Sequence, residues 1–480
     1  MESFAISASR TQLDRAGGAR ETLRVEIARA YRNGGFPKGG SLRSSIVLCL
    51  ILFAATAAAQ VAEDPGPSIL SRGVGALLEG GGTPPTIRPF LSLSGIYDTG
   101  LTAVSVDATG AIPQASSFGG ELGFGVVGYK RGRRTVVGID YRGDVRVYSG
   151  HSYYDGTNHT LTLSVTRQLT SRTTLVFRQA AGIQSGSFGT VGGYAPFDPA
   201  IAGVPANELF NSRTYYLTSM ANLIFQKSSR LSFGVGGSGN LIRRRSSALV
   251  GTTGYNANAD VSYRIIRNVT LGADYSFGHT AFTKGLGSSD IQSTGLNVTF
   301  RMGRSWELAL RLGAARVSIV NPIRISFDPI VAAIVGQTYG ILVFQNTYFL
   351  PSSSARLSRT FRRSVFSVAY DNSPSVGNGV FTTSKSQGVG ANYSFTGLRR
   401  LNLGISGGYS TLTSLSDNLG RYSSYSGGAG VNYRLKSWLH LSGNYDARKY
   451  GVSQGSFNRL SHRLSLGLTF SPGERPLSLR

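Results

Sequence analysis

The most regular feature of the sequence is an alternation of apolar and polar residues that recurs along most of the chain. In residues 401–410, the apolar side chains of Leu401, Leu403 and Ile405 occupy every second position, and small or polar residues lie between them. The same period of two occurs at 160–166 and at 463–470. Because successive side chains of a β-strand point to opposite faces, this pattern predicts strands with one apolar face.

A repeated turn unit joins these runs in pairs. In residues 261–275, 297–313 and 431–445, an alternating run ends on an aromatic residue, a short basic turn follows, and a second alternating run begins. Weaker copies of the unit lie at 128–141, 222–237 and 391–409. No segment with helical periodicity separates the copies. The pattern therefore predicts an all-β protein, an antiparallel up-and-down β-barrel.

The polar face of these runs indicates that the apolar face points outward, into a membrane. The polar face is rich in Gly, Ser, Thr and Asn, which suits a wet interior, and many apolar runs end in an aromatic residue beside a turn. Such aromatics are typical of the interfacial girdle of a transmembrane barrel. A soluble sandwich or solenoid, with its apolar face inside, is the alternative. The candidate girdle residues are Tyr129, Phe225, Tyr263, Phe300, Tyr393, Tyr433 and Phe470.

The number of short basic turns predicts the number of strands. These turns lie near 131–134, 169–172, 227–230, 264–268, 301–305, 359–363, 396–400 and 434–437. Eight turns join sixteen strands, and flanking strands at about 87–98 and 460–470 raise the total to about eighteen. Sixteen is the alternative, because residues 319–358 are hard to divide. An even number with both chain ends on the short-turn side is typical of barrels with short periplasmic turns and longer extracellular loops.

Two of the longer loops have unusual sequences. Loop 186–212 is rich in proline and aromatic residues, and loop 319–341 contains the apolar run Ile330–Val335. Either loop folds into the barrel and narrows it, or the loops pack as an extracellular cap. The sequence leaves both possibilities open.

The N-terminal region resembles an export signal followed by a linker. Residues 46–55 form an apolar core, Arg43 supplies its positive flank, and a small-residue cleavage site precedes Gln60. The predicted segments are an N-terminal extension (1–42), a signal peptide (43–59), a periplasmic linker (60–86), the transmembrane barrel (87–470) and a C-terminal tail (471–480). This organisation predicts that the protein is located in a bacterial outer membrane.

The formal net charge of +25 does not indicate nucleic-acid binding, because much of it lies at the short turns. At a membrane surface, basic turn residues contact lipid phosphates. A second basic group, Arg243–Arg245, is expected near the outer rim, where it meets anionic lipid of the outer leaflet. Outer-membrane lipids are therefore predicted partners, and nucleic acid is not.

Charged residues of both signs fall on the polar face and are candidates to line a pore. By alternation, these residues are Asp140, Arg142, Asp144, Arg146, Arg178, Asp260, Asp274, Glu307 and Arg311. Facing rows of acidic and basic side chains create a transverse field that selects among charged or sugar solutes. The alternative is that they form ion-pair ladders that hold the barrel together, and the two roles are compatible.

The sequence offers no catalytic or cofactor chemistry. The one cysteine, Cys49, lies in the predicted signal peptide, so no disulfide, thiol nucleophile or thiolate metal site is expected in the barrel. The five histidines are scattered, without the spacing of a metal site. We expect no cofactor, no metal and no enzymatic activity.

With the turns and the closing strand in place, the chain resembles the outer-membrane β-barrel superfamily of diderm bacteria, in particular porin-like barrels. The strand at 463–470, RLSLGLTF, is similar to the C-terminal signal that the barrel-assembly machinery reads, with alternate apolar residues ending on Phe470. It departs from that pattern because ten residues, Ser471 to Arg480, follow Phe470. The resemblance implies this machinery as a partner in assembly.

The resemblance implies a channel for passive diffusion of small polar or charged solutes. One alternative is an export barrel for a polysaccharide. Another is a plugged barrel with a structural or adhesive role. A homo-oligomer is compatible with all three, and the sequence identifies neither the solute nor the ion selectivity.

Overall fold

The computed structural model describes residues 86–102, 112–185, 210–303, 305–326, 339–376, 379–396, 398, 400–415, 420–453, 457–472 and 475–476. All of these residues belong to one compact unit. The predicted extension and signal peptide lie outside the described residues, as does the linker apart from Thr86. Among the described residues, no helix has the length and hydropathy needed to cross a membrane.

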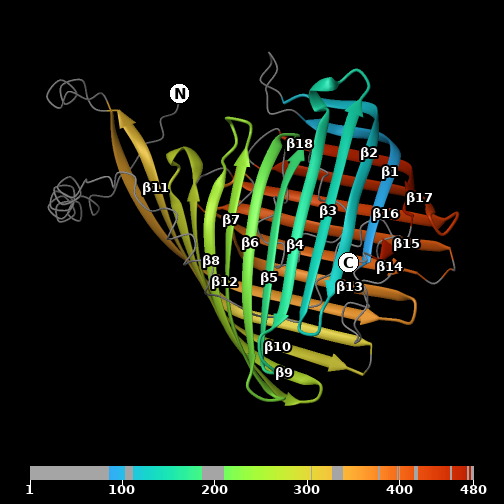
Figure 1. The fold of residues 1–480 in the computed structure, drawn as a ribbon. Coiled ribbons are helices and arrows are strands. Elements are labelled where there is room, and N and C mark those ends of the chain that lie inside the picture. Colours follow the sequence, from blue (N-terminus) through green and yellow to red (C-terminus); the bar gives the residue numbers. More distant parts are fainter. Residues whose placement is uncertain are drawn as a thin grey trace, which may run out of the picture. The chain divides into compact units, whose positions relative to one another are not determined.

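The described residues form eighteen long strands and one strand of two residues, which follow one another around a barrel (Figure 1). They are β1 (Thr86–Thr102), β2 (Gln114–Arg131), β3 (Thr135–Tyr148), β4 (Gly156–Gln168), β5 (Thr173–Ser185), β6 (Arg213–Gln226), β7 (Leu231–Arg244), β8 (Thr252–Ile266), β9 (Val269–Phe282), β10 (Ser288–Met302), β11 (Trp306–Ser326), β12 (Tyr339–Thr360), β13 (Ser364–Ser375), β14 (Ser384–Phe395), β15 (Leu401–Ser414), β16 (Arg421–Arg434), β17 (Leu439–Val452), β18 (Asn458–Phe470) and β19 (Arg475–Pro476). Two 3-10 turns, η3 (Ser152–Tyr154) and η6 (Thr283–Gly285), lie between strands.

The sheet closes on itself. Each long strand pairs antiparallel with the next one in sequence, and β18 pairs with β1, from Leu91 opposite Phe470 to Asp98 opposite Arg463. Closure leaves no free edge along the paired part of the sheet, so backbone groups there find partners within it. The prediction of an all-β, up-and-down barrel with eighteen strands is confirmed, and the alternative of sixteen is wrong.

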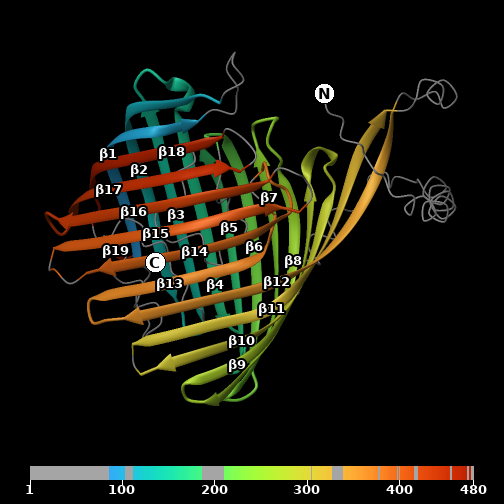
Figure 2. The same ribbon diagram turned by 180° about the vertical axis from the view of Figure 1, so that it is seen from behind.

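The eight predicted short turns all join the expected strands, and they lie at one end of the barrel (Figure 2). In the turn between β10 and β11, Gly303 has a φ of 66°, a conformation that side chains with a Cβ rarely adopt. The start of β1 and the end of β18 lie at this end too, because Leu91 pairs with Phe470. We call it the short-turn end and the opposite one the long-loop end.

The hairpin of β11 and β12 differs from the predicted loop at 319–341. β11 continues to Ser326 and β12 begins at Tyr339, so the predicted loop boundaries are wrong, and the hairpin extends beyond its neighbours (Figure 1). The last β11 residue to pair with β10 is Val320. Pro322 therefore lies where β11 has a free edge, a position at which a strand tolerates proline. The apolar run Ile330–Val335 lies outside the described residues.

The two faces of the sheet differ as the alternation predicts. Leu93, Leu296 and Leu312 lie on the outer face and are 66%, 67% and 68% exposed. Small and polar residues occupy the inner face, together with the buried clusters described below. A soluble sandwich would bury the leucines instead, so the side chains follow the opposite arrangement.

Candidate functional site: the inner wall and its long-loop end

The strand register places all nine predicted pore-lining residues on the inner face. Residues directly opposite in an antiparallel pair share a face. Asp140, Arg142, Asp144 and Arg146 alternate with the outward Val137, Ile139 and Val147 of β3, which are 45%, 40% and 55% exposed. The same alternation and pairing place Arg178, Asp260, Asp274, Glu307 and Arg311 inward.

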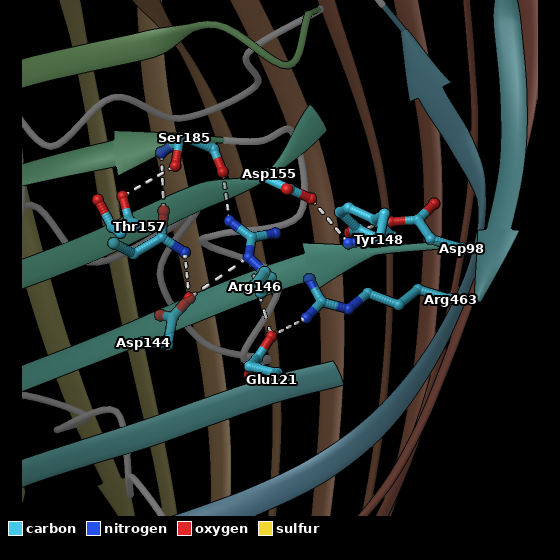
Figure 3. Close-up of polar contacts among 10 residues, drawn as sticks. Asp98, Glu121, Asp144, Arg146, Tyr148, Asp155, Thr157, Ser185 and Arg463 are labelled. Atoms are coloured by element: carbon cyan, nitrogen blue, oxygen red, sulfur yellow. Dashed lines mark hydrogen bonds and ion pairs between the residues drawn. The ribbon is translucent and has the colours of Figure 1, made fainter. Parts of the chain in front are cut away.

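Glu121 is the centre of a charged cluster that joins three strands across the closure of the barrel (Figure 3). Its carboxylate forms an ion pair with Arg463 of β18 and lies 3.9 Å from Nε of Arg146 of β3. The side chains of Arg146 and Arg463 are only 4% and 12% exposed. One carboxylate on β2 is therefore shared by two guanidinium groups that the solvent screens weakly.

Further polar groups hold Arg146 in place from the β4 and β5 side. Its Nε lies 3.3 Å from Oδ2 of Asp144, and its guanidinium donates a hydrogen bond to the carbonyl oxygen of Ser185. Asn158 donates to Asp144 at 3.0 Å and accepts from the backbone N–H of Ser185 at 2.7 Å. The cluster thus extends from β18 to β5, and each of its side chains has little freedom.

A more buried acid, Asp98, lies in the same region of the wall. It is 2% exposed and accepts hydrogen bonds from the backbone N–H of Gly100 at 2.8 Å and from the hydroxyl of Tyr148 at 3.4 Å. It is directly opposite Arg463 in the register, as is Asp446 on the other neighbouring strand. Arg463 is therefore flanked by acids on both sides.

A second charged cluster lies on β9 to β12. The guanidinium of Arg311 contacts both oxygens of Asp274, with Nη2 at 2.7 Å from Oδ2 and Nε at 3.0 Å from Oδ1. It also donates to the hydroxyls of Ser352 at 2.7 Å and Ser293 at 3.2 Å. Asn297 donates to Asp274 at 2.7 Å. Such two-pronged contacts fix the geometry as well as the charge.

The remaining predicted residues are more accessible. Arg142 and Asp140 form a pair at 2.8 Å within one strand, with side chains 27% and 34% exposed. Glu307 pairs with Arg301 at 3.2 Å near the short-turn end, where both side chains are about half exposed or more. Arg178 forms no ion pair with the residues that the structure describes. Accessible charges on the inner face show that solvent reaches the interior of the barrel.

Replacing Arg311 with lysine is expected to destabilise the barrel although the charge is kept. Lysine cannot contact both oxygens of Asp274 and two serines at once. We expect the free energy of unfolding to fall by about 1.5–3 kcal/mol, the size of lost hydrogen bonds to charged groups. Arg142→Lys is the matched control: Arg142 also contacts both oxygens of Asp140, but that pair is more exposed, so a smaller change, below about 1 kcal/mol, is expected. Equal effects, measured by urea unfolding with the fluorescence of Trp306 and Trp438, would contradict the assignment.

An apolar cluster lies on the inner face near the long-loop end. Phe381, which follows β13, packs with Leu412, Tyr422 and Tyr450, and each of the four is at most 4% exposed. The hydroxyl of Tyr422 accepts a hydrogen bond from Arg448 at 2.7 Å, and the Arg448 guanidinium lies 4.7 Å from the centre of the Tyr450 ring. A loop segment is thus anchored to the inner wall.

Backbone hydrogen bonds join segments at the long-loop end that belong to distant strands. The N–H of Val250, between β7 and β8, donates to the carbonyl oxygen of Gly379, between β13 and β14, at 2.9 Å. Asn211, just before β6, donates to Thr102 at the end of β1, also at 2.9 Å. Because these strands are not neighbours in the sheet, the segments cross the interior or mouth of the barrel. We call them the mouth segments: 210–212, 249–251 and 379–383.

Only part of the two loops that were predicted to narrow the barrel, 186–212 and 319–341, is described. Of loop 186–212, residues 210–212 are described, and Phe210 packs against Phe457 with ring centres 5.9 Å apart. Residues 186–209 and 327–338 lie outside the described residues. The segment 379–383 was missed, because its short sequence shows neither the proline nor the apolar run that drew attention to the other loops.

Sequence reasoning also missed the charged residues that hold the inner wall together. Glu121, Asp98 and Arg463 satisfy the same alternation as the predicted pore-lining residues, so parity alone would have found them. Arg448 satisfies it as well, two residues before the inward Tyr450. The alternation does not show which charges meet, because this depends on how the strands are staggered.

The register places six of the seven candidate girdle residues on the outer face near the short-turn end. They are Phe225, Tyr263, Phe300, Tyr393, Tyr433 and Phe470, which are 38–46% exposed. Tyr129 is a correction, because it pairs with Gly138 and so shares the inner face with Asp140. The outward residues of β2 have even numbers, such as Leu122, and the aromatic before this turn is out of phase with them.

The described residues show no metal-binding cluster of three or more His, Cys, Asp or Glu. His279 lies beside Asp290 at 2.6 Å, and both side chains are on the outer face by register. His462 and His159 each contact a tyrosine hydroxyl on the outer face. His440 faces inward but is 5% exposed.

No known protein-family profile matches the sequence, and no curated protein matches it. Solved structures that are similar to the chain include the outer membrane protein opdK from Pseudomonas aeruginosa, with 13% identity, a TM-score of 0.39, and coverage of 80% of this chain and 98% of that chain. Pseudomonas aeruginosa OpdQ has 13% identity, a TM-score of 0.40, and coverage of 81% and 98%. Acinetobacter baumannii OccAB4 has 12% identity, a TM-score of 0.38, and coverage of 82% and 100%.

Proposed function

We propose that the protein is a porin-like channel of a bacterial outer membrane, through which small polar or charged solutes diffuse passively. The observation that carries this proposal is the contrast between the two faces of one closed barrel. The outer face exposes leucines, and the inner face carries solvent-accessible charges of both signs. Such a barrel is built to lie in hydrocarbon while it holds water inside.

The dimensions and closure of the barrel support the membrane location. The long strands have 12 to 22 residues, and a tilted strand needs about 9–11 residues to cross the hydrocarbon core. Closed pairing satisfies the backbone without water, which the bilayer interior requires. The outward aromatics near the short-turn end form an interfacial girdle, and the basic turns beyond them contact lipid phosphates.

In this proposal the short turns face the periplasm, and residues 43–59 direct export. β18 presents alternate outward leucines ending on Phe470, the feature that the barrel-assembly machinery reads in the families that the chain resembles. The chain does not end at β18: the short strand β19 follows it and pairs with Thr86 and Ile87 of β1. A homo-oligomer remains compatible with this arrangement.

The inner wall supports conduction without chemistry. Many of its charged groups are paired with one another, as in the Arg311–Asp274 contact, and the inner wall orients solutes by its field rather than by reaction. The protein has no enzymatic activity in this proposal and needs no cofactor. The mouth segments narrow the path at the long-loop end, which favours a restricted channel over a wide pore.

Purified protein in planar bilayers is expected to give stable, ohmic conductance steps. Water and ions follow the accessible inner wall, so each inserted barrel contributes one step. The reversal potential in a salt gradient will show whether the inward arginines or the inward carboxylates dominate ion selectivity. A small conductance that polysaccharide blocks would favour the export barrel. The absence of conductance from a barrel shown to be folded would contradict the channel and favour a plugged, structural protein.

A further inference from the structure

A groove lies on the outer wall of the barrel, across β3 to β7, with a volume of about 360 Å³. Its lining includes Tyr141, His159, Ala181, Leu217 and Arg243, which the register places on the outer face. The groove therefore opens on the outer face, although its lining also includes Gly182 and Tyr216, which alternate with the outward residues. If the barrel spans a membrane, as proposed above, this groove faces lipid.

The hollow arises from the side chains that stand in register across these strands. One row runs from Tyr141 through Leu161, Ala181 and Leu217 to Leu241. Ala181 is the smallest member and lies between two leucines, so the surface dips at its position. The floor is consequently apolar and has the form of a furrow between larger side chains.

One wall of the groove is an aromatic assembly. The rings of Tyr141 and His159 are nearly parallel, at 9°, and the hydroxyl of Tyr141 lies 3.1 Å from Nδ1 of His159. The Phe124 ring meets His159 edge-on, with centres 6.1 Å apart. These contacts hold the wall in one conformation, so the groove exists before any ligand arrives.

The groove ends in positive charge at the long-loop end. Arg243 is exposed in the row of Tyr215 and Ile183, one position before the end of β7, and Arg245 is exposed just beyond that end. The backbone N–H of Arg245 bonds to the carbonyl oxygen of Arg213, which brings a third basic residue to the same place. None of the three arginines forms an ion pair with a described acidic residue.

An apolar furrow with a cationic end matches an amphiphile with an aliphatic chain and an anionic head. Guanidinium groups suit phosphate in particular, because they donate parallel hydrogen bonds to its oxygens. We propose that this groove is a binding site for a phosphorylated glycolipid of the outer leaflet. One acyl chain lies over Ala181, and a headgroup phosphate contacts Arg243 and Arg245. The inference rests on the proposed membrane location but not on conduction.

The test is to titrate the full-length protein with diphosphoryl lipid A in phosphatidylcholine nanodiscs and to count bound lipid by native mass spectrometry after extraction. The wild type is expected to bind lipid A saturably and in preference to phosphatidylcholine. Arg243→Gln with Arg245→Gln is expected to weaken binding by roughly twenty-five-fold, from about fivefold for each charge near a membrane surface. Ala181→Leu fills the furrow without changing the charge and is also expected to weaken binding.

Two controls separate a built site from general effects. Arg421→Gln with Lys449→Gln removes the same charge from outward positions near the long-loop end of β16 and β17, and Ala259→Leu adds the same bulk to the outer face of β8. Both are expected to bind as the wild type does. Equal losses in the charge control, or unchanged binding in Ala181→Leu, would overturn the site. Conductance of the same samples is measured separately. A barrel that binds lipid A but does not conduct would contradict the proposed channel function and leave the lipid site intact.

Discussion

Replacing Glu121 with glutamine is expected to lower the free energy of unfolding of the barrel by about 2–3 kcal/mol. Removing one partner of a buried ion pair costs about 3–5 kcal/mol, and the 24% exposure of Glu121 and the nearby acids reduce that figure. The variant leaves Arg146 and Arg463 facing each other with one carboxylate fewer. The change is measured by urea unfolding of the refolded protein in lipid vesicles, followed by tryptophan fluorescence.

Asp140→Asn provides the matched control for the Glu121 variant. It removes the same charge from the same inner wall, but from a pair within one strand whose members are both more exposed. We expect it to change the free energy of unfolding by less than about 1 kcal/mol. If both variants behave alike, Glu121 does not join β18 to β2 and β3, and the cluster contributes only to the field inside the barrel.

Replacing Phe381 with alanine is expected to raise the single-channel conductance severalfold. The Phe381 ring anchors a mouth segment among Leu412, Tyr422 and Tyr450, and burying a phenylalanine of this kind contributes about 3–5 kcal/mol locally. Without the ring, segment 379–383 leaves the wall and the path widens. The strands themselves lose no pairing, so we expect the variant to remain a folded barrel, with a lower unfolding midpoint because the buried ring is lost.

Tyr153→Ala is the control for the mouth. Tyr153 also lies in a connection at the long-loop end, but its side chain is 71% exposed and does not belong to the apolar cluster. Its removal is expected to leave conductance unchanged. A Phe381→Ala protein that conducts as the wild type does would show that segment 379–383 does not restrict the path.

The alternation of the sequence predicted most of the fold, because period two leaves each side chain only two directions. It assigned Asp140 to Arg146 to the inner face, and the basic turns supplied the number of strands. It was wrong for Tyr129, where the aromatic before the turn was assumed to face outward without counting from Leu122. It was also wrong at 319–326, which was assigned to a loop although β11 continues to Ser326.

The contacts within the charged cluster could not be predicted from the alternation of apolar and polar residues. Arg463 and Glu121 are separated by 342 positions, and they meet only because the last strand pairs with the first. Which charges oppose one another depends on the stagger of the strands, for which a single sequence gives no measure. The contacts between the mouth segments could not be predicted either, because Val250 and Gly379 meet through backbone atoms, which every residue type has.

Because β1 pairs with β18, the barrel closes only when the whole chain from β1 to β18 is present. Residues 91–98 find their second neighbours only in residues 463–470, so no intermediate length of the chain forms a finished sheet. A chain that stops before β18 retains two open strand edges, which in other proteins lead to aggregation. The closure seen here therefore requires a chain that is complete through β18.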